Sequence, residues 1–183
     1  ACALLPTLYA RLSKQLQSEC QGLLLDLAND QTPMVRRAMM ENLPKVIAIV
    51  DAPTLEKKIF PVFLKLAADL QDSVRRLAIK SCIALATTPS GSSNAEIRQA
   101  IIHCVQKLQA DMSWRIRWSV ANSFTQLAKC IGMETLRDPL LGMYCSLLED
   151  AEDEVRAAAA LQIKKVSSLL TTKEIVDQLL PRI

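Results

Sequence analysis

The sequence is poor in glycine, histidine and aromatic residues. Its 183 residues include four glycines, one histidine and only 4% aromatic side chains. No glycine-rich phosphate loop is present, and one histidine is too few for the ligand clusters of metal enzymes. An enzyme is therefore not expected, and neither a cofactor nor a metal is predicted. With 50% hydrophobic residues, the composition favours an all-helical array packed with Leu, Ala, Val and Ile over a β-sandwich.

Long apolar runs, a large net charge and paired cysteines are also missing. Apolar stretches such as Val46–Val50 are far shorter than the ~18 to 20 residues that a transmembrane helix needs. A net charge of +3 is too small to predict a nucleic-acid or membrane partner. No CxxC pair occurs, so we expect reduced, mostly packed thiols in a cytosolic or nuclear protein. The cysteines are Cys2, Cys20, Cys82, Cys104, Cys130 and Cys145.

The sequence does contain a string that returns four times. An Asp is followed, after four variable residues, by a β-branched aliphatic residue and an Arg. The gaps between successive copies are 39, 42 and 39 residues, which lie within the period range of helical solenoids. We therefore expect a repeat protein that works through an extended surface rather than a pocket. The pairs are Asp30 with Arg36, Asp69 with Arg75, Asp111 with Arg117, and Asp150 with Arg156.

Apolar residues on both sides of each Asp recur with helical spacing, so each repeat is predicted to be a helix, a tight turn and a second helix. Thr32 and Pro33 look like an N-cap and a first helical residue. The segments 51–53, 87–94 and 171–172 and Gly132 are predicted to be loops between repeats. The predicted repeats span 18–51, 52–93, 94–132 and 133–170, with half repeats at 1–17 and 173–183. Because both ends fall within a repeat, we expect a piece of a longer array.

The four repeated Asp and Arg residues recur too regularly to be catalytic. We interpret them as a structural ladder, in which each Arg reaches an Asp in the turn of its own or a neighbouring repeat. A planar guanidinium can bind a carboxylate through two hydrogen bonds, and such pairs would hold the repeats in register.

The turn residues beside the ladder are better functional candidates, because one cluster per repeat would stack along one edge of the array. Trp114 and Arg115 are the strongest of them, since this pair of residue types is enriched at interface hot spots. Trp118 is expected to be more packed than Trp114, and His103 to be buried or half-buried. We call this set the candidate ridge: Thr32, Pro33, Met34, Arg37, Gln71, Asp72, Ser73, Arg76, Met112, Ser113, Trp114, Arg115, Trp118, Glu152, Asp153 and Glu154.

A turn Asp with an Arg six residues later, in units of about 40 residues, resembles the HEAT repeat. Pro61 stands where that consensus has a first-helix proline, whereas Gly22, His103 and Gly142 depart from it. The strings DQTPMVRR (30–37), QDSVR (71–75), SWRIR (113–117) and EVRAAA (154–159) are similar to consecutive middle repeats of the scaffold (A) subunits of protein phosphatase 2A. The resemblance implies an all-α solenoid, a right-handed superhelix of antiparallel helix pairs.

The resemblance also implies a function. In that family the turns within repeats form a docking ridge, and early and middle repeats receive a regulatory (B-type) subunit. The catalytic subunit is held by C-terminal repeats, which this chain is not expected to reach. Two alternatives stay open: a HEAT-repeat transport or chromatin adaptor with cargo on its concave face, and a HEAT-like DNA glycosylase, against which the nearly balanced charge argues.

Overall fold

The computed structural model describes residues 3–183, except for the side chains of residues 133–138, and Cys2 lies outside this range. Every regular element of the described residues is helical, which confirms the predicted all-α class. The chain divides into two compact units, residues 1–101 and 102–183, so that the boundary falls within α9 (Ala95–Gln109). Each unit is described by itself below. No helix in the described part of the chain combines the length and apolarity that crossing a membrane requires.

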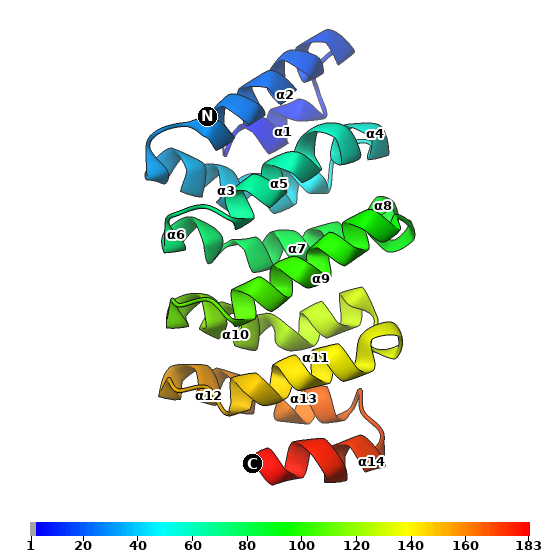
Figure 1. Ribbon diagram of the computed structural model, residues 1–183. Helices are drawn as coiled ribbons and strands as arrows, with labels where there is room; N and C mark the ends of the chain where they lie inside the picture. Colours follow the sequence, from blue (N-terminus) through cyan, green and yellow to red (C-terminus); the bar gives the residue numbers. More distant parts are fainter. Residues whose placement is uncertain (1–2) are drawn as a thin grey trace. The chain divides into compact units, whose positions relative to one another are not determined.

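Unit 1 is built from helix pairs arranged in two layers (Figure 1). The first helix of each pair packs on its successor, as α2 does on α3, and also on the first helix of the next pair, α5. The second helices α3 and α7 pack together in the other layer. The elements are α1 (Leu5–Tyr9), α2 (Lys14–Asn29), α3 (Pro33–Ile47), α4 (Ala52–Thr54), η1 (Leu55–Ile59), α5 (Phe60–Ala67), α6 (Asp72–Arg75), α7 (Ala78–Ala86) and α8 (Pro89–Ser93).

The second unit continues the same pattern of packed pairs. Helix α10 packs on both α11 and α12, and α11 also packs on α12. The buried rings of Phe124 and Tyr144 contact each other in this unit, with centroids 4.8 Å apart and planes tilted by 37°. The Tyr144 hydroxyl donates to the Ala159 carbonyl oxygen at 2.7 Å, so its buried polar end is satisfied. The elements are α10 (Trp114–Ile131), α11 (Met133–Leu148), α12 (Asp153–Ala160), α13 (Ile163–Ser167), α14 (Thr172–Glu174), η2 (Ile175–Leu179) and η3 (Leu180–Arg182).

Two first helices widen into a π-helical turn immediately before a proline. In η1 the N–H of Phe60 donates to the carbonyl of Leu55, five residues earlier, and Pro61 follows. The same bond joins Leu180 to Ile175 in η2, just before Pro181. A proline has no N–H and its ring collides with the carbonyl four residues back. The wider turn makes room for the ring, so each helix continues past its proline.

Several predicted boundaries and loops differ from the structure. Helix α2 begins at Lys14 rather than at residue 18, because the Ser13 hydroxyl accepts a hydrogen bond from the N–H of Leu16 at 3.4 Å. The segment 87–94 is predicted to be a loop, but it contains the short helix α8, in which the Thr88 side chain accepts a hydrogen bond from the N–H of Gly91. Residues 51–53 and 171–172 start helices instead of forming loops, through caps by Asp51 and Thr171.

The second helices of two repeats are interrupted. Residues 76–77 separate α6 from α7, and residues 161–162 separate α12 from α13. At the first break the N–H of Leu77 donates to the carbonyl of Val74, three residues earlier, so the helix tightens locally. The N–H of Gln162 donates to Ala159 in the same manner. The helical period of the sequence continues across both breaks and therefore did not predict them.

Gly91 provides a test of how closely α8 packs on α7. A methyl group at Gly91 would collide with the carbonyl oxygen of Leu85, a backbone atom that has little freedom to move. Gly91→Ala is therefore expected to lower the free energy of unfolding by about 1–3 kcal/mol, as measured by urea denaturation.

The control for this variant is Gly22→Ala in the same unit. Nothing lies within 4 Å of the position that a methyl group would take at Gly22, in the interior of α2. Its replacement should stabilise the helix by up to about 1 kcal/mol. Equal unfolding midpoints for the two variants would contradict the close approach of α8 to α7.

Candidate interaction surface

Each of the four turns is closed by the side chain of its repeated Asp. Its Oδ1 accepts a hydrogen bond from the backbone N–H two residues later, at distances between 2.7 and 3.0 Å. This is an Asx turn, in which a side chain replaces a missing backbone partner. Thr32 is the N-cap residue of α3 and Pro33 its first residue, as predicted, although the Thr32 side chain makes no capping bond. Asp30 instead accepts the N–H of Thr32.

The repeated Arg closes the same turn from the other side. In every copy its Nη1 donates to the carbonyl oxygen of the Asp six residues earlier and to that of the residue after this Asp. The first distance lies between 2.6 and 2.8 Å and the second between 3.0 and 3.2 Å. Two carbonyls that no helix uses are thereby satisfied, so turn and second helix form one rigid piece.

Arg36 and Arg117 also bind the Asp of the following repeat. Arg36 donates from Nε and Nη2 to the carboxylate of Asp69, at 2.6 and 3.0 Å. In unit 2, Arg117 binds Asp150 in the same bidentate way, at 2.7 and 2.9 Å. The carboxylates are largely shielded from solvent, with exposed fractions of 7% and 8%. Each such pair connects two successive turns of one unit.

These ion pairs shift the pKa values of their members. The hydrogen bonds from Arg36 hold the pKa of Asp69 below its usual range, against the opposing effect of burial. Arg117 lowers the pKa of Asp150 in the same way. The pKa values of the two arginines are raised by the hydrogen bonds to their Asp partners. Both pairs are therefore charged at neutral pH.

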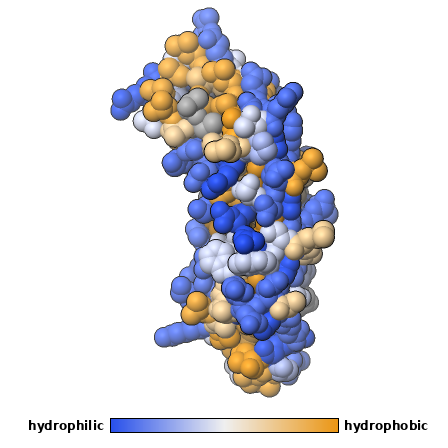
Figure 2. All heavy atoms as spheres, turned by 90° about the vertical axis from the view of Figure 1, so that its left-hand side faces the viewer, coloured by the Kyte–Doolittle hydropathy of each residue, from blue (hydrophilic) through white to orange (hydrophobic). Residues whose placement is uncertain are grey.

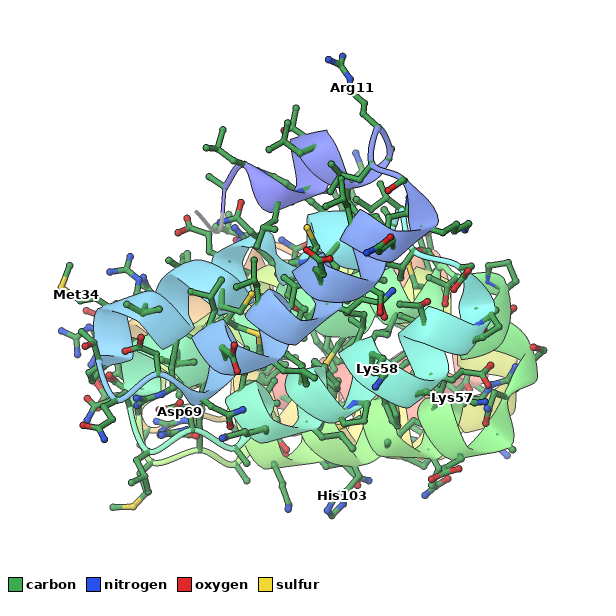
Figure 3. The ribbon with its side chains drawn as sticks, turned by 90° about the horizontal axis from the view of Figure 1, so that it is seen from above. Arg11, Met34, Lys57, Lys58, Asp69 and His103 are labelled. Atoms are coloured by element: carbon green, nitrogen blue, oxygen red, sulfur yellow. The ribbon has the colours of Figure 1, made fainter. Side chains whose placement is uncertain are left out.

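The candidate ridge of unit 1 lies around these fixed turns. Met34 is 77% exposed and projects from the start of α3 (Figure 3). Arg37 is also exposed, one position after the ladder Arg36. Of the remaining unit 1 members, Thr32, Gln71 and Asp72 are exposed, whereas Pro33, Ser73 and Arg76 are half-buried. The turn side of each unit faces the viewer in Figure 2, where hydrophilic residues predominate and hydrophobic ones are interspersed.

In unit 2 the ridge residue Met112 is 99% exposed. Trp114 is half-buried, and the guanidinium carbon of Arg115 lies 4.6 Å from its ring centroid, in a cation–π contact. The prediction that Trp118 is the more packed tryptophan is wrong: Trp118 is 39% exposed, because it points away from the buried stripe of α10. Of the other members, Ser113 and Glu152 are half-buried, and Asp153 and Glu154 are exposed. Asp153 forms an ion pair with Arg156.

Leu70 is an exposed side chain that the sequence did not identify as a candidate. It is 93% exposed and directly follows the ladder residue Asp69, as Met112 follows Asp111. Its carbonyl accepts a hydrogen bond from Arg75 at 3.0 Å, so the backbone of the turn is fixed while the side chain points outward. An apolar residue directly after the repeated Asp is the sequence signal that could have identified it.

A groove of about 380 Å³ lies beside the Arg36–Asp69 pair in unit 1. It is lined by the turn residues Gln31 and Leu70 and by Lys65, whose ammonium group donates to the Asn29 side chain. The groove thus combines cationic, carboxylate, amide and apolar groups between two turns. This mixture suits a protein partner with polar and apolar side chains at its interface.

The described residues offer little for catalysis. His103 was predicted to be at least half-buried, but it is exposed and points away from the helices (Figure 3), because it falls on the outer face of α9. Burial raises the pKa of the Cys130 and Cys145 thiols, which makes them poor nucleophiles. Cys82 and Cys104 are buried, and Cys20 is half-buried. No group of three metal-ligating side chains occurs among the residues that the structure describes.

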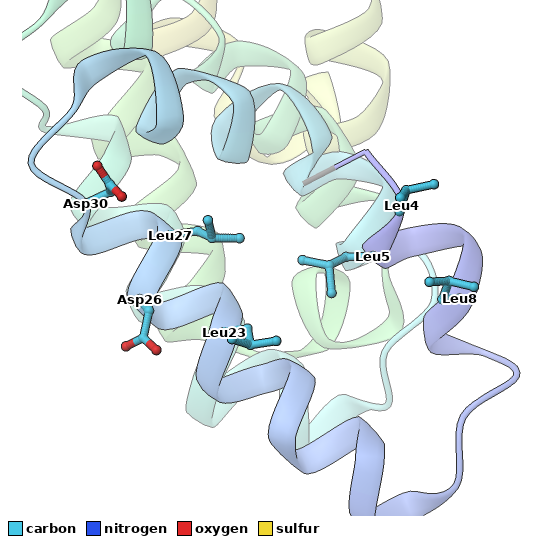
Figure 4. Close-up of a pocket in the computed structure, with 7 residues that line it drawn as sticks. All are labelled: Leu4, Leu5, Leu8, Leu23, Asp26, Leu27 and Asp30. Carbon is cyan, nitrogen blue, oxygen red and sulfur yellow. The ribbon is translucent and has the colours of Figure 1, made fainter. Parts of the chain in front are cut away.

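An apolar pocket of about 340 Å³ between α1 and α2 also lacks catalytic chemistry (Figure 4). Five leucines line it together with Asp26 and Asp30. Asp30 already accepts the N–H of Thr32 at 2.7 Å. Its carboxylate is therefore part of the turn rather than a general base.

Comparisons with known proteins agree with this architecture. Residues 133–183 match the family described as PPP2R1A-like HEAT repeat. The regulatory A subunit of protein phosphatase PP2A from Schizosaccharomyces pombe is 35% identical over 112 residues, 61% of this chain and 19% of that protein. Its counterpart of the same name from Saccharomyces cerevisiae is 33% identical over 135 residues, 70% of this chain and 21% of that protein. The chain spans about a fifth of the length of these relatives.

A solved structure shares the fold. A designed armadillo repeat protein in complex with the peptide (KR)4 aligns with a TM-score of 0.52 and 21% identity, over 91% of this chain and 74% of that chain. The helix pairs and the repeated turns define the chain as a HEAT-repeat α-solenoid. At 33–35% identity, the chain is further a relative of the regulatory A subunits of protein phosphatase 2A.

The lowered pKa values of Asp69 and Asp150 predict the acid sensitivity of the chain. A carboxyl with a lowered folded-state pKa contributes stability that is complete above its unfolded pKa of about 3.9 and is lost as the pH falls further. The free energy of unfolding, from urea titrations between pH 7 and pH 3, should therefore decline below about pH 4.

Removing both charges by Asp69→Asn and Asp150→Asn should lower stability at pH 7 and flatten this decline. Asn can still accept the turn N–H, so the change removes mainly the ion pair. The control is Asp177→Asn, because Asp177 is exposed and in no ion pair of the described residues. A decline in the double variant as steep as that of the unaltered chain would rule out these two pairs as its source.

Proposed function

We propose that this chain is a non-catalytic scaffold segment of a serine/threonine phosphatase 2A holoenzyme. We further propose that its intra-repeat turns dock a regulatory, B-type subunit. The scaffold role is supported by the relatives, which are named regulatory subunits of this phosphatase. Their name is also consistent with a chain that has no catalytic activity of its own.

The observation that carries the docking proposal is that different side chains of each turn have different roles. The Asp and Arg of the ladder are engaged in internal hydrogen bonds, whereas the side chains beside them are presented to solvent. Met34, Leu70 and Met112 are 77%, 93% and 99% exposed, although Leu70 and Met112 stand on fixed turns and Met34 in the first turn of α3. Large apolar side chains on a fixed backbone bury area on binding with little further loss of backbone freedom.

The cations of the candidate ridge suit a partner with acidic groups. Arg37 and Arg76 each follow a ladder arginine, and no ion pair within the described residues engages either of them. Their charges are thus available to a carboxylate of the partner. Lys65 adds a third cation at the groove between the two turns of unit 1.

Charge reversal tests this part of the surface. Arg37→Glu and Arg76→Glu should each weaken the binding of a purified B-type subunit by at least about tenfold, because like charges would then face each other. Isothermal titration calorimetry measures the affinity. Lys57→Glu makes the same change of charge at an exposed position far from Met34 (Figure 3) and should leave binding unchanged. Equal losses in all three variants would instead indicate a general effect of net charge.

Removing single side chains tests the apolar part of the ridge. Trp114→Ala should weaken binding by about thirtyfold, the loss typical of an interface hot spot of about 2 kcal/mol. Because Trp114 is half-buried, Leu70→Ser serves as a second variant whose side chain contributes almost nothing to the fold. It should weaken binding while the melting temperature stays the same. Unchanged affinity in both variants, with the fold intact, would show that the turns do not contact the regulatory subunit.

A further inference from the structure

Unit 2 contains a polar groove away from the turns. Its volume is about 430 Å³, and α10 supplies Asn122, Gln126 and Lys129 to its lining. Gln162 and Lys165, from the start of α13, form the other wall. The Thr125 hydroxyl and the Oε1 atom of Gln162 are hydrogen-bonded at 2.9 Å, which ties the two walls together. Both walls belong to the same compact unit.

The sequence of α10 places these groups in one row. Asn122, Gln126 and Lys129 are four and three residues apart, so they share one face of the helix, and all three are exposed. Helix α10 has no acidic residue in its 18 positions, and neither does α13. The groove therefore has a positive charge from Lys129 and Lys165 without a carboxylate in its lining.

The polar groups of this groove are largely unused. Asn122 and Gln126 form no side-chain hydrogen bond to any described residue, and Lys129 and Lys165 form no ion pair within the same part of the chain. Gln162 uses its carbonyl oxygen in the bond to Thr125, which leaves its amide nitrogen to donate elsewhere. Side-chain amides combine a donor and an acceptor, as a peptide bond does.

The dimensions suit a short stretch of extended chain. Asn122 and Lys129 are separated by about 10 Å along the helix axis, at about 1.5 Å per residue. An extended peptide covers this distance with about three residues. The lining contains no aromatic side chain, so the groove lacks the stacking platform on which single-stranded nucleic acids are bound.

We propose that this groove binds an extended, acidic peptide segment of a partner protein. The amides of Asn122, Gln126 and Gln162 bind its backbone, and Lys129 and Lys165 bind an Asp or Glu side chain. This site is separate from the turn surface and does not depend on the proposed docking of a regulatory subunit.

The test uses the 183-residue chain and a fluorescein-labelled octapeptide of alternating Glu and Ser, followed by fluorescence anisotropy. Saturable binding is expected, with none for the corresponding Lys and Ser peptide. Asn122→Ala combined with Gln126→Ala should weaken binding by about thirtyfold, the loss expected from two net hydrogen bonds of about 1 kcal/mol each. Lys129→Glu combined with Lys165→Glu should abolish it.

The matched control reverses two other charges of the same unit. Lys107→Glu combined with Lys173→Glu changes the net charge equally at exposed positions outside the groove and should retain nearly full affinity. An equal loss in the control pair would overturn the proposal. Absent or unsaturable binding of the acidic peptide would also overturn the proposal. An eight-nucleotide single-stranded DNA that binds as tightly as the peptide, with the same dependence on Lys129 and Lys165, would overturn it too.

Discussion

The guanidinium of the repeated arginine is the group on which the turn structure depends. It donates hydrogen bonds to two carbonyl oxygens of its own turn, and in Arg36 and Arg117 it also donates to the carboxylate of the next Asp. A lysine at this position has a single ammonium group and no planar fork, so it lacks the geometry to make these bonds together. One side chain therefore fixes both the shape of a turn and its distance from the next.

The fixed turns determine what the rest of the surface can do. The polar atoms of the ladder are satisfied within the protein, and the neighbouring side chains are free to meet a partner. Leu70 and Met112 illustrate this division, because the carbonyl of each accepts a bond from an arginine while its side chain lies almost fully in solvent. The second helices offer a different surface in unit 2, where the amides of Asn122 and Gln126 and the ammonium groups of Lys129 and Lys165 are not engaged by the described residues.

The sequence predicted the helix pairs because the helical period and the repeated string are local patterns that survive in each copy. It left open whether an arginine binds its own Asp or a neighbouring one, since both lie at suitable separations in sequence. In Arg36 and Arg117 the same guanidinium binds the backbone carbonyl of its own Asp through Nη1 and the carboxylate of the neighbouring Asp through Nε and Nη2. The exposure of Trp118 and His103 was misjudged, because which side of an amphipathic helix is covered depends on the packing of neighbouring helices. Leu70 was missed because apolar residues are normally assigned to the core.

Amide hydrogen exchange of the chain, alone and with a B-type regulatory subunit, measures the docking surface most directly. Because the turns are the proposed contact, exchange in residues 30–37, 69–76, 111–118 and 150–156 should slow on complex formation. The segments at the other ends of the helices, including 87–94 with α8, should exchange as before. Protection confined to those loops or to the second-helix groove, with unchanged exchange in the four turns, would contradict the account.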